Sequence, residues 1–358
     1  MRRNYIGTLV LCSLAGSVAV HGQVLATQRA GFNLPLGQVP APNTPGGAVV
    51  LGSNLYTGDG ANGFRHWKPA DPANPDPINS GFLVFDSTAG FSWGGGGLCF
   101  DFCQVGQIAY DGSQTVYLTA YDHQKGNGLS FPGIWRLVID PASGFITDAF
   151  QLVPNAGLAG NNPTSIALGP DGNLYVGFLK NGNVVRIVNP NINPALDPQK
   201  TQVVQSVGTA PNGRPVRALA FVGKDLYLAT SDGLAVIKNA VAPTCQGGCN
   251  GAPIPDGFSG TAHVGLTSDG INRLYVAING QGVWRYTLSN GAMNLISTGG
   301  PDPNTGTALT FAFVAGHTNL LQLDRLGNLW IGDDISDGAA NFSGRIWYIS
   351  AGALSNIP

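Results

Sequence analysis

Short apolar stretches separated by tight turns follow one another along most of the chain. The clearest copy begins with Pro163–Leu168, passes through a Pro-Asp-Gly-Asn turn, and continues with Leu174–Phe178 and Asn183–Val188. Apolar runs of about 4–8 residues between such turns are typical of β-strands in hairpins. The pattern therefore predicts three antiparallel strands, with the aromatic residue Tyr175 in the second and the basic residue Arg186 in the third.

This unit recurs along the chain. Its first two strands are predicted at 48–56, 107–118, 163–178, 218–228, 264–276 and 320–331. The same aromatic position is filled by Tyr56, Tyr117, Tyr175, Tyr227, Tyr275 and Trp330. A third strand is predicted at 81–86, 133–140, 183–188, 233–238, 282–288 and 344–350, and a weaker fourth at 149–153, 201–207 and 292–297. Four antiparallel strands repeated around a channel predict an all-β fold, a six-bladed β-propeller of four-stranded blades.

A sandwich of two many-stranded sheets is the alternative, but it gives no reason for an aromatic residue to return at the same place in every unit. Only eight residues follow Ser350. We therefore expect the N-terminal stretch 32–39 to supply the outer strand of the last blade, because an unpaired edge would otherwise be exposed. The repeat predicts a single domain over residues 23–358.

The unit P-x-x-I-A-x-x-P-D-G-N-L-Y-V-G at 163–177, followed by V-x-R-I at 184–187, resembles the NHL repeat. It is also similar to the wider six-bladed group that includes streptogramin B lyase, gluconolactonase and regucalcin. The resemblance covers essentially the whole mature chain and implies the blade geometry. The recurring residues form turns and packing contacts, so the resemblance implies little about chemistry.

The N-terminus has the order of a secretory signal peptide. Arg2 and Arg3 precede an apolar run of 15 residues from Ile6 to Val20, and small-residue cleavage sites follow at 20–22 or 24–26. The run is shorter than the roughly 20 residues of a membrane-spanning helix. Cys12 lacks the small preceding residue of a lipoprotein signal. We expect a signal peptide over 1–22, with cleavage as late as 26, and a secreted or periplasmic monomer without a membrane anchor.

Charge excludes some partners and weakens one enzyme interpretation. Removal of residues 1–22 leaves 16 basic and 20 acidic residues, a net charge of −4, which disfavours nucleic acid and anionic membranes. All 20 acidic residues are aspartates, and the chain contains no glutamate. Gluconolactonase and streptogramin lyase sites both use a glutamate, so the resemblance carries over no catalytic residue.

The predicted propeller brings polar residues from different blades to one mouth of its channel. At this face the innermost strands begin, the second strands end, and long loops are predicted at 59–80, 122–132 and 333–343. The candidate ligand-binding residues there are Asp59, Asp122, Arg217, His263, Asn319 and Asp333. The candidate metal ligands are Asp59, Asp232, Asn279 and Asp334. The candidate catalytic residues are His263, His317 and Asp122.

These candidates compete with simpler interpretations. An aspartate at a strand end is often a turn residue that binds its own backbone. Arg217 and His263 are stronger candidates, because they interrupt small, apolar innermost strands, where a charge is costly unless it faces the channel or a ligand. A cation at the mouth, calcium in particular, is possible, but 333–338 departs from the EF-hand pattern.

Four mature cysteines stand in two Cys-x3-Cys pairs, Cys99 with Cys103 and Cys245 with Cys249. In an exported protein this count predicts two disulfides. The pairs fall on opposite sides of the predicted ring, so local pairing needs no loop to cross the channel. The same separation argues against a four-thiolate zinc site.

We therefore expect a propeller that binds a small molecule, a glycan or an extracellular protein at the long-loop mouth, with a bound cation as an option. The loop aromatics Phe64, Trp67, Phe131 and Phe342 would provide stacking surfaces. The alternative is a metal-assisted lactonase or other hydrolase, or a lyase, that uses aspartate and histidine in the channel.

Overall fold

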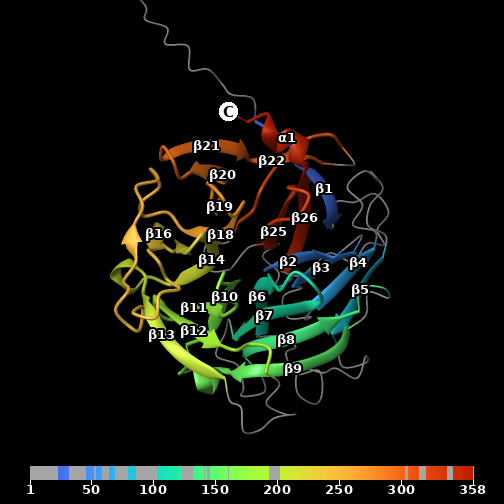
Figure 1. The fold of residues 1–358 in the computed structure, drawn as a ribbon. Helices are drawn as coiled ribbons and strands as arrows, with labels where there is room; N and C mark the ends of the chain where they lie inside the picture. The colour runs from blue at the N-terminus through green and yellow to red at the C-terminus, as the bar shows by residue number, and fades with distance from the viewer. Residues whose placement is uncertain are drawn as a thin grey trace, which may run out of the picture.

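The computed structural model describes residues 23–31, 46–51, 54–58, 64–68, 80–85, 103–122, 132–140, 142, 146–159, 161–192, 202–302, 305–313, 320–336 and 342–357. These residues form a β-propeller whose four-stranded antiparallel blades stand around a common centre (Figure 1). The predicted all-β propeller is confirmed. Among the helices that the structure describes, none is long and apolar enough to cross a membrane.

The described strands form six four-stranded sheets, numbered here in chain order. Sheets 1 to 3 contain β2 Ala48–Leu51, β3 Asn54–Gly58, β4 Phe64–Lys68 and β5 Ser80–Phe85; β6 Cys103–Tyr110, β7 Thr115–Asp122, β8 Gly133–Ile139 and β9 Ile146–Pro154; and β10 Pro163–Leu168, β11 Leu174–Phe178, β12 Asn183–Val188 and β13 Val203–Thr209. Sheets 4 to 6 contain β14 Val216–Val222, β15 Asp225–Thr230, β16 Gly233–Ile237 and β17 Ala252–Pro253; β18 His263–Ser268, β19 Arg273–Ile278, β20 Gly282–Thr287 and β21 Ala292–Ser297; and β24 Leu321–Leu323, β25 Leu329–Ser336, β26 Phe342–Ile349 and β1 Thr27–Gly31. The remaining elements are the ribbon of β22 Gly299–Pro301 and β23 Ala308–Thr310, the 3-10 turns η2 Asn155–Leu158 and η3 Pro211–Gly213, and the helix α1 Ala351–Ser355.

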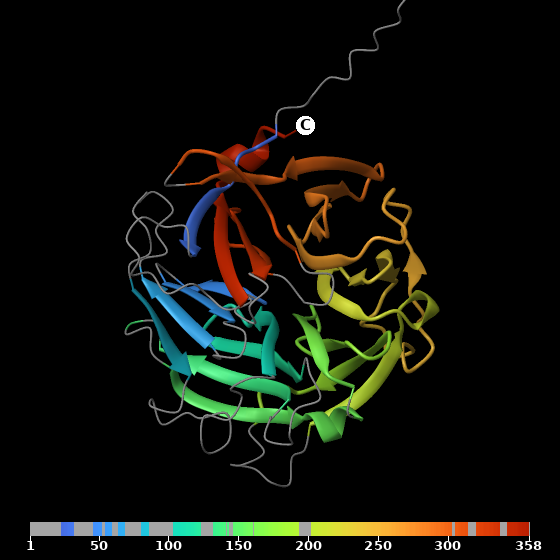
Figure 2. The ribbon, with the colours of Figure 1, turned by 180° about the vertical axis from the view of Figure 1, so that it is seen from behind.

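The N-terminus completes the last sheet, as the sequence predicts, but with a different segment. β1 pairs antiparallel with β26, and Figure 2 shows the two strands side by side. The predicted stretch 32–39 lies outside the described residues, and the strand that pairs comes earlier in the chain. Its position follows from the residues just before it, because the amides of Val24 and Ala26 donate to the carbonyls of Ile296 and Gly299, each at 2.9 Å.

The recurring aromatic residues are the packing centres of the sheets. All of them are at most 5% exposed: Tyr56, Tyr117, Tyr175, Tyr227, Tyr275 and Trp330. The Tyr175 hydroxyl donates to Asp171 in the hairpin turn of its own sheet, at 2.9 Å, and the Trp330 indole donates to Asp324 in the same way, at 3.0 Å. The turn aspartates thus satisfy the polar ends of buried rings. In register, Arg186 lies opposite Tyr175, so the basic residue of the repeat is structural.

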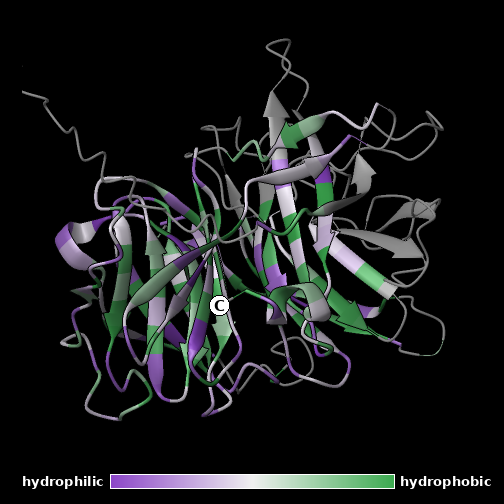
Figure 3. Cartoon of the chain, turned by 90° about the horizontal axis from the view of Figure 1, so that it is seen from above, coloured by the Kyte–Doolittle hydropathy of each residue, from purple (hydrophilic) through white to green (hydrophobic). Residues whose placement is uncertain are grey.

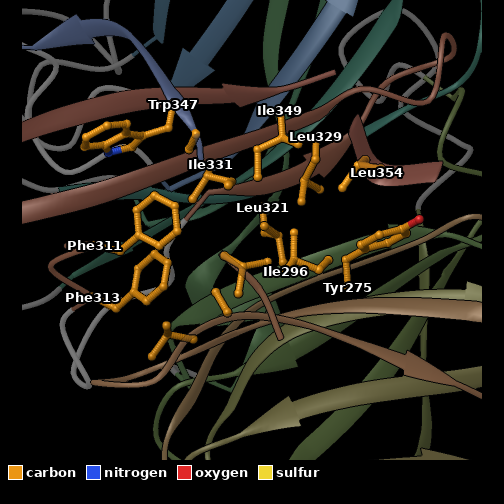
Figure 4. Packing of buried hydrophobic residues seen from close by; sticks show 14 of the residues in the cluster. Tyr275, Ile296, Phe311, Phe313, Leu321, Leu329, Ile331, Trp347, Ile349 and Leu354 are labelled. Atoms are coloured by element: carbon orange, nitrogen blue, oxygen red, sulfur yellow. The ribbon is translucent and has the colours of Figure 1, made fainter. Parts of the chain in front are cut away.

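Apolar side chains fill the spaces between neighbouring sheets. Figure 3 shows hydrophobic segments along the strands, while hydrophilic residues are frequent in the loops. Between sheets 5 and 6, Phe311 lies with its ring centre 5.3 Å from that of Phe313 and 5.6 Å from that of Trp347 (Figure 4). Leu354 of α1 joins the same cluster, so the C-terminal helix is packed against the core.

One of the two predicted disulfides is present. Cys245 is bonded to Cys249 in the connection between β16 and β17, which confirms the local pairing for this pair. Cys99 lies outside the described residues, and of Cys103 only the backbone is described, as part of β6. The pairing of Cys99 with Cys103 therefore stays a prediction.

Candidate functional site

β-Bulges mark the mouth end of four innermost strands. The register shifts between Val105 and Ile108 in β6 and at equivalent places in β10, β14 and β18. The residues within these bulges include Gln107, Thr164, Arg217 and Val264. A bulge adds a residue to one strand and redirects its side chain, which is why bulges are frequent beside functional sites. Three of these four positions carry polar side chains.

Gln107 crosses the centre of the ring. Its amide nitrogen donates to the carbonyls of Leu219, at 2.7 Å, and Leu266, at 3.3 Å. Its amide oxygen accepts from the backbone amides of Ile166, at 3.2 Å, and Leu219, at 2.8 Å. One side chain thus connects the innermost strands of sheets 2, 3, 4 and 5. A polar residue in an apolar innermost strand is the only sequence signal for this role.

Gln107 also lines a cavity at the other end of the channel. This cavity has a volume of about 300 Å³ and is lined by the last residues of the innermost strands, where the hairpin turns begin. At its rim the guanidinium of Arg325 donates to the carbonyl of Gly112 and lies 5.1 Å from the centre of the Tyr110 ring. The two ends of the channel therefore present different groups.

Arg217 lies near the start of β14, at the mouth end of this innermost strand. It is the bulged residue of β14 and is only 8% exposed. The preceding carbonyl, of Val216, accepts a hydrogen bond of 2.6 Å from the Thr164 hydroxyl, and the carbonyl of Thr164 accepts one of 3.2 Å from Thr119. These hydroxyl groups connect sheets 2, 3 and 4, so the backbone beside Arg217 is held by its neighbours.

His263 is fully buried at the start of β18. Its Nδ1 lies 2.8 Å from the carbonyl oxygen of Thr261, which can only accept, so this nitrogen donates. Its Nε2 lies 2.8 Å from the Asp256 carboxylate, which also accepts from the amides of Leu234, at 3.2 Å, and Phe258, at 2.9 Å. Both ring nitrogens are therefore engaged within the protein. Asp256 lies in the β17–β18 connection. Its bonds to Leu234 and His263 hold this connection against sheets 4 and 5.

We expect the Asp256–His263 pair to make stability depend on pH. Burial alone would raise the pKa of Asp256, but hydrogen bonds from His263 and from two backbone amides hold it below the usual value. A lowered folded-state pKa contributes stability above the unfolded value of about 3.9, and this stability is lost as the pH falls below it. Asp256→Asn should lower the melting temperature at pH 7 and flatten its decline between about pH 5 and 3.

Melting curves recorded from pH 3 to 8 would check this expectation. Asp148→Asn is the matched control, because this carboxylate is 49% exposed and lies 3.7 Å from Arg136. If the melting temperature of Asp256→Asn falls with acid as steeply as that of the wild type, another carboxylate determines the loss of stability at low pH.

Asp333, a candidate ligand, is fully buried and fully engaged. Its Oδ1 accepts from Nε of Arg345 and from the Trp347 indole, each at 3.0 Å. Its Oδ2 accepts from Nη2 of Arg345 and, at 2.9 Å, from the Ala312 amide. The carboxylate thus neutralises an arginine that is 2% exposed. This geometry gives Asp333 a structural role.

The other candidates are described only in part. Asp232 lies 3.5 Å from Nε of Arg214, in a cleft between sheets 3 and 4. Asn279 is half-buried, and its backbone amide donates to the Ala262 carbonyl at 3.0 Å. The backbone of Asp122 pairs with Cys103, and that of Asp334 with Gly344, but their side chains are not described. Asp59, His317 and Asn319 lie outside the described residues.

The described residues do not assemble the cation site predicted from the sequence. Within them, no group of three or more histidine, cysteine, aspartate or glutamate side chains could hold a metal ion. Asp232 is near an arginine, and Asp333 is bonded to one. Calcium prefers six to eight oxygen ligands. The described residues therefore form no calcium site, and the predicted cation site, which includes Asp59 and Asp334, stays a prediction.

Comparison with known proteins places the fold. No protein-family model matches the sequence, and no curated protein sequence matches it. Among solved structures, a protein of unknown function from Bacteroides thetaiotaomicron is 13% identical, with a TM-score of 0.58, over 90% of this chain and 75% of that one. The similarity shows a shared β-propeller fold.

Two further structures have named functions. A gluconolactonase from Xanthomonas campestris is 14% identical, with a TM-score of 0.51, over 90% of this chain and 89% of that one. The calcium-binding protein regucalcin from Agrobacterium tumefaciens is 13% identical, with a TM-score of 0.52, over 92% and 95%. At this identity the likeness is one of fold, and the function must be argued from the site.

Proposed function

We propose that this protein hydrolyses a small, hydroxylated lactone or ester at the mouth of the propeller channel. The proposal rests on the bulges that gather Gln107, Thr164 and Arg217 at one end of the innermost strands. Arg217 adds a permanent positive charge at a position that is 8% exposed. In such a place a guanidinium binds a carbonyl oxygen strongly and stabilises the negative charge that develops on it during attack by water.

In this reaction, water adds to the carbonyl carbon, the bond to the ester oxygen breaks, and a hydroxy acid leaves. Asp122 is the candidate base, because the end of β7 brings its backbone to the same face. The fold shared with a gluconolactonase supports this choice of substrate class. Gln107 bonds across the ring to Leu219 and Leu266, so we expect substrate to enter and product to leave through the mouth.

The second candidate is binding without turnover, of a small molecule, a glycan or an extracellular protein. One observation favours it: the imidazole of His263 and the carboxylate of Asp333 are both engaged within the protein. These groups cannot serve as bases without breaking buried bonds. The two candidates share the mouth and differ in whether the bound molecule is cleaved.

A hydrolysis assay separates them. We expect the mature protein to release acid from an aldonolactone. Titration at constant pH, with and without added calcium, would measure this release. Arg217→Ala should lower kcat/KM by about 100-fold, the usual effect of removing one donor to an oxyanion. Asp122→Asn should lower kcat with little change in KM.

Arg325→Ala is the matched control, because it removes an arginine from the opposite end of the channel. Loss of activity in Arg325→Ala with full activity in Arg217→Ala would move the site to the hairpin-turn end. Saturable lactone binding without acid release would support the second candidate.

We further infer that the six sheets are six blades of one closed ring, since each innermost strand contacts the next around the circle and β24 contacts β2.

We also propose export, with the mature chain beginning near Gln23. Cleavage after Ala26 would remove the two amide bonds to Ile296 and Gly299 that anchor β1. The mass of the exported protein would distinguish the two cleavage sites.

A further inference from the structure

A second cleft, separate from the channel, lies between sheets 3 and 4 on the mouth face. Its volume is about 570 Å³. Three segments form its walls: the β13–β14 connection at 209–214, the β15–β16 turn at 230–235, and the segment around 250–253 with Ser259. The site proposed for hydrolysis uses none of these residues.

The polar groups of this cleft carry both charges. Nε of Arg214 lies 3.5 Å from the Asp232 carboxylate, and the two side chains are 53% and 33% exposed. Such an exposed pair is worth about 0–1 kcal/mol, so a ligand can replace the partner at little cost. Oδ1 of Asn250 accepts a hydrogen bond of 2.9 Å from the Thr209 hydroxyl. The N–H donors of the same side-chain amide take no part in this bond.

The charged groups stand on rigid backbone. The amides of Gly213 and Arg214 donate to the carbonyls of Ala210 and Pro211, at 3.1 and 3.2 Å, which closes the turn before Arg214. On the opposite wall, the Thr230 hydroxyl donates to the Gly233 carbonyl at 2.7 Å and accepts from the Asp232 amide at 3.1 Å. Fixed positions reduce the entropy lost when a ligand binds.

The third wall is held by the disulfide. The amides of Gly247, Cys249 and Gly251 donate to the carbonyls of Ser206, Val207 and Thr209 of β13, at 2.9, 3.2 and 2.7 Å. The Cys245–Cys249 bond closes this segment, which we call the strap, 245–251. It lies so close to β13 that a Cβ on Gly208 would come within 2.0 Å of the Cys249 carbonyl oxygen. The position of Asn250 therefore depends on the strap.

We propose that this cleft binds a small carboxylic acid that carries hydroxyl groups. Its carboxylate would pair with the guanidinium of Arg214, which is the strongest kind of hydrogen-bonded contact available here. Its hydroxyl groups would donate to the Asp232 carboxylate and accept from the Asn250 amide. A neutral sugar has no anion to pair with the guanidinium of Arg214. A simple acid such as acetate has no hydroxyl groups to bond with Asp232 and Asn250. Both should therefore bind more weakly.

Calorimetry with D-glucuronate as the probe tests this proposal. We expect saturable binding to the mature protein, weaker binding of D-glucose and of acetate, and at least a tenfold loss of glucuronate affinity in Arg214→Ala. The matched control is Lys238→Ala, which removes the cation of an exposed pair with Asp225 at the other end of sheet 4. Equal losses in both variants would show a general charge effect and overturn the site.

Two further outcomes bear on the proposal. No saturable heat at glucuronate concentrations up to about 10 mM, above the usual range of weak ligands, would overturn it. Cys245→Ser with Cys249→Ser should weaken glucuronate binding while the protein still melts cooperatively; unchanged affinity would contradict the role of the strap. Arg217→Ala should bind glucuronate normally, so the failure of the hydrolase proposal and the failure of this one are distinguishable.

Discussion

Replacing Asp333 with asparagine should lower the free energy of unfolding by about 3–5 kcal/mol, because it leaves the buried Arg345 charge without its counter-ion. The side chain keeps its size, so the loss would come from charge and hydrogen bonding. The Trp347 indole and the Ala312 amide share the same carboxylate, and their bonds weaken with it. Urea unfolding followed by tryptophan fluorescence, with equal m-values for both proteins, would measure the effect.

A double variant checks the cause. If the penalty comes from an uncompensated charge, Asp333→Leu with Arg345→Met should be closer to the wild type than Asp333→Asn alone, because buried ion pairs can often be replaced by apolar residues. A loss below about 0.5 kcal/mol in Asp333→Asn, the range of ordinary surface changes, would contradict the structural role. Asp333 would then again be a candidate ligand residue.

Removing residues 23–31 from the mature chain should lower stability by at least about 3–5 kcal/mol, judged from several strand hydrogen bonds at roughly 1 kcal/mol each. The deletion takes away β1 and exposes the edge of β26, which then offers unpaired backbone groups to other chains. We expect a large fall in melting temperature together with aggregation. Thermal unfolding and size-exclusion chromatography would record the two effects.

A chain that begins at Thr27 separates the strand from its anchor. It keeps β1 but loses the amide bonds from Val24 and Ala26 to the neighbouring segment, so its stability should lie between those of the two other chains. If the chain without residues 23–31 melts as the full mature chain does, β1 does not hold the ring closed.

The fold could be predicted from the sequence because its information is local and repeated. Tyr175 and Trp330 recur after the same kind of turn, and in both cases the turn aspartate bonds to the ring. The sequence predicts the closing strand at 32–39, later than its observed position, because that position depends on contacts of Val24 and Ala26 with residues near 296–299. Such pairings over most of the chain length leave no local pattern.

The site was harder to predict for a related reason. A charge in an apolar strand indicates that a partner exists but not which one. For His263 the partner, Asp256, stands in an irregular connection outside the repeat. For Asp333 the partner, Arg345, lies directly opposite on the next strand, so the hairpin register could have identified it. Gln107 acts through backbone groups of three other sheets, which sequence patterns do not encode.

The pairing of β1 with β26 also sets an order of events during synthesis. Thr27 is made long before its partner Tyr348, because most of the chain described here lies between them. The first strand must therefore wait, unpaired, while the other sheets form, and contacts so distant in sequence are slow to close. New chains of this protein should remain susceptible to proteases around Thr27 until β26 is available to pair with β1.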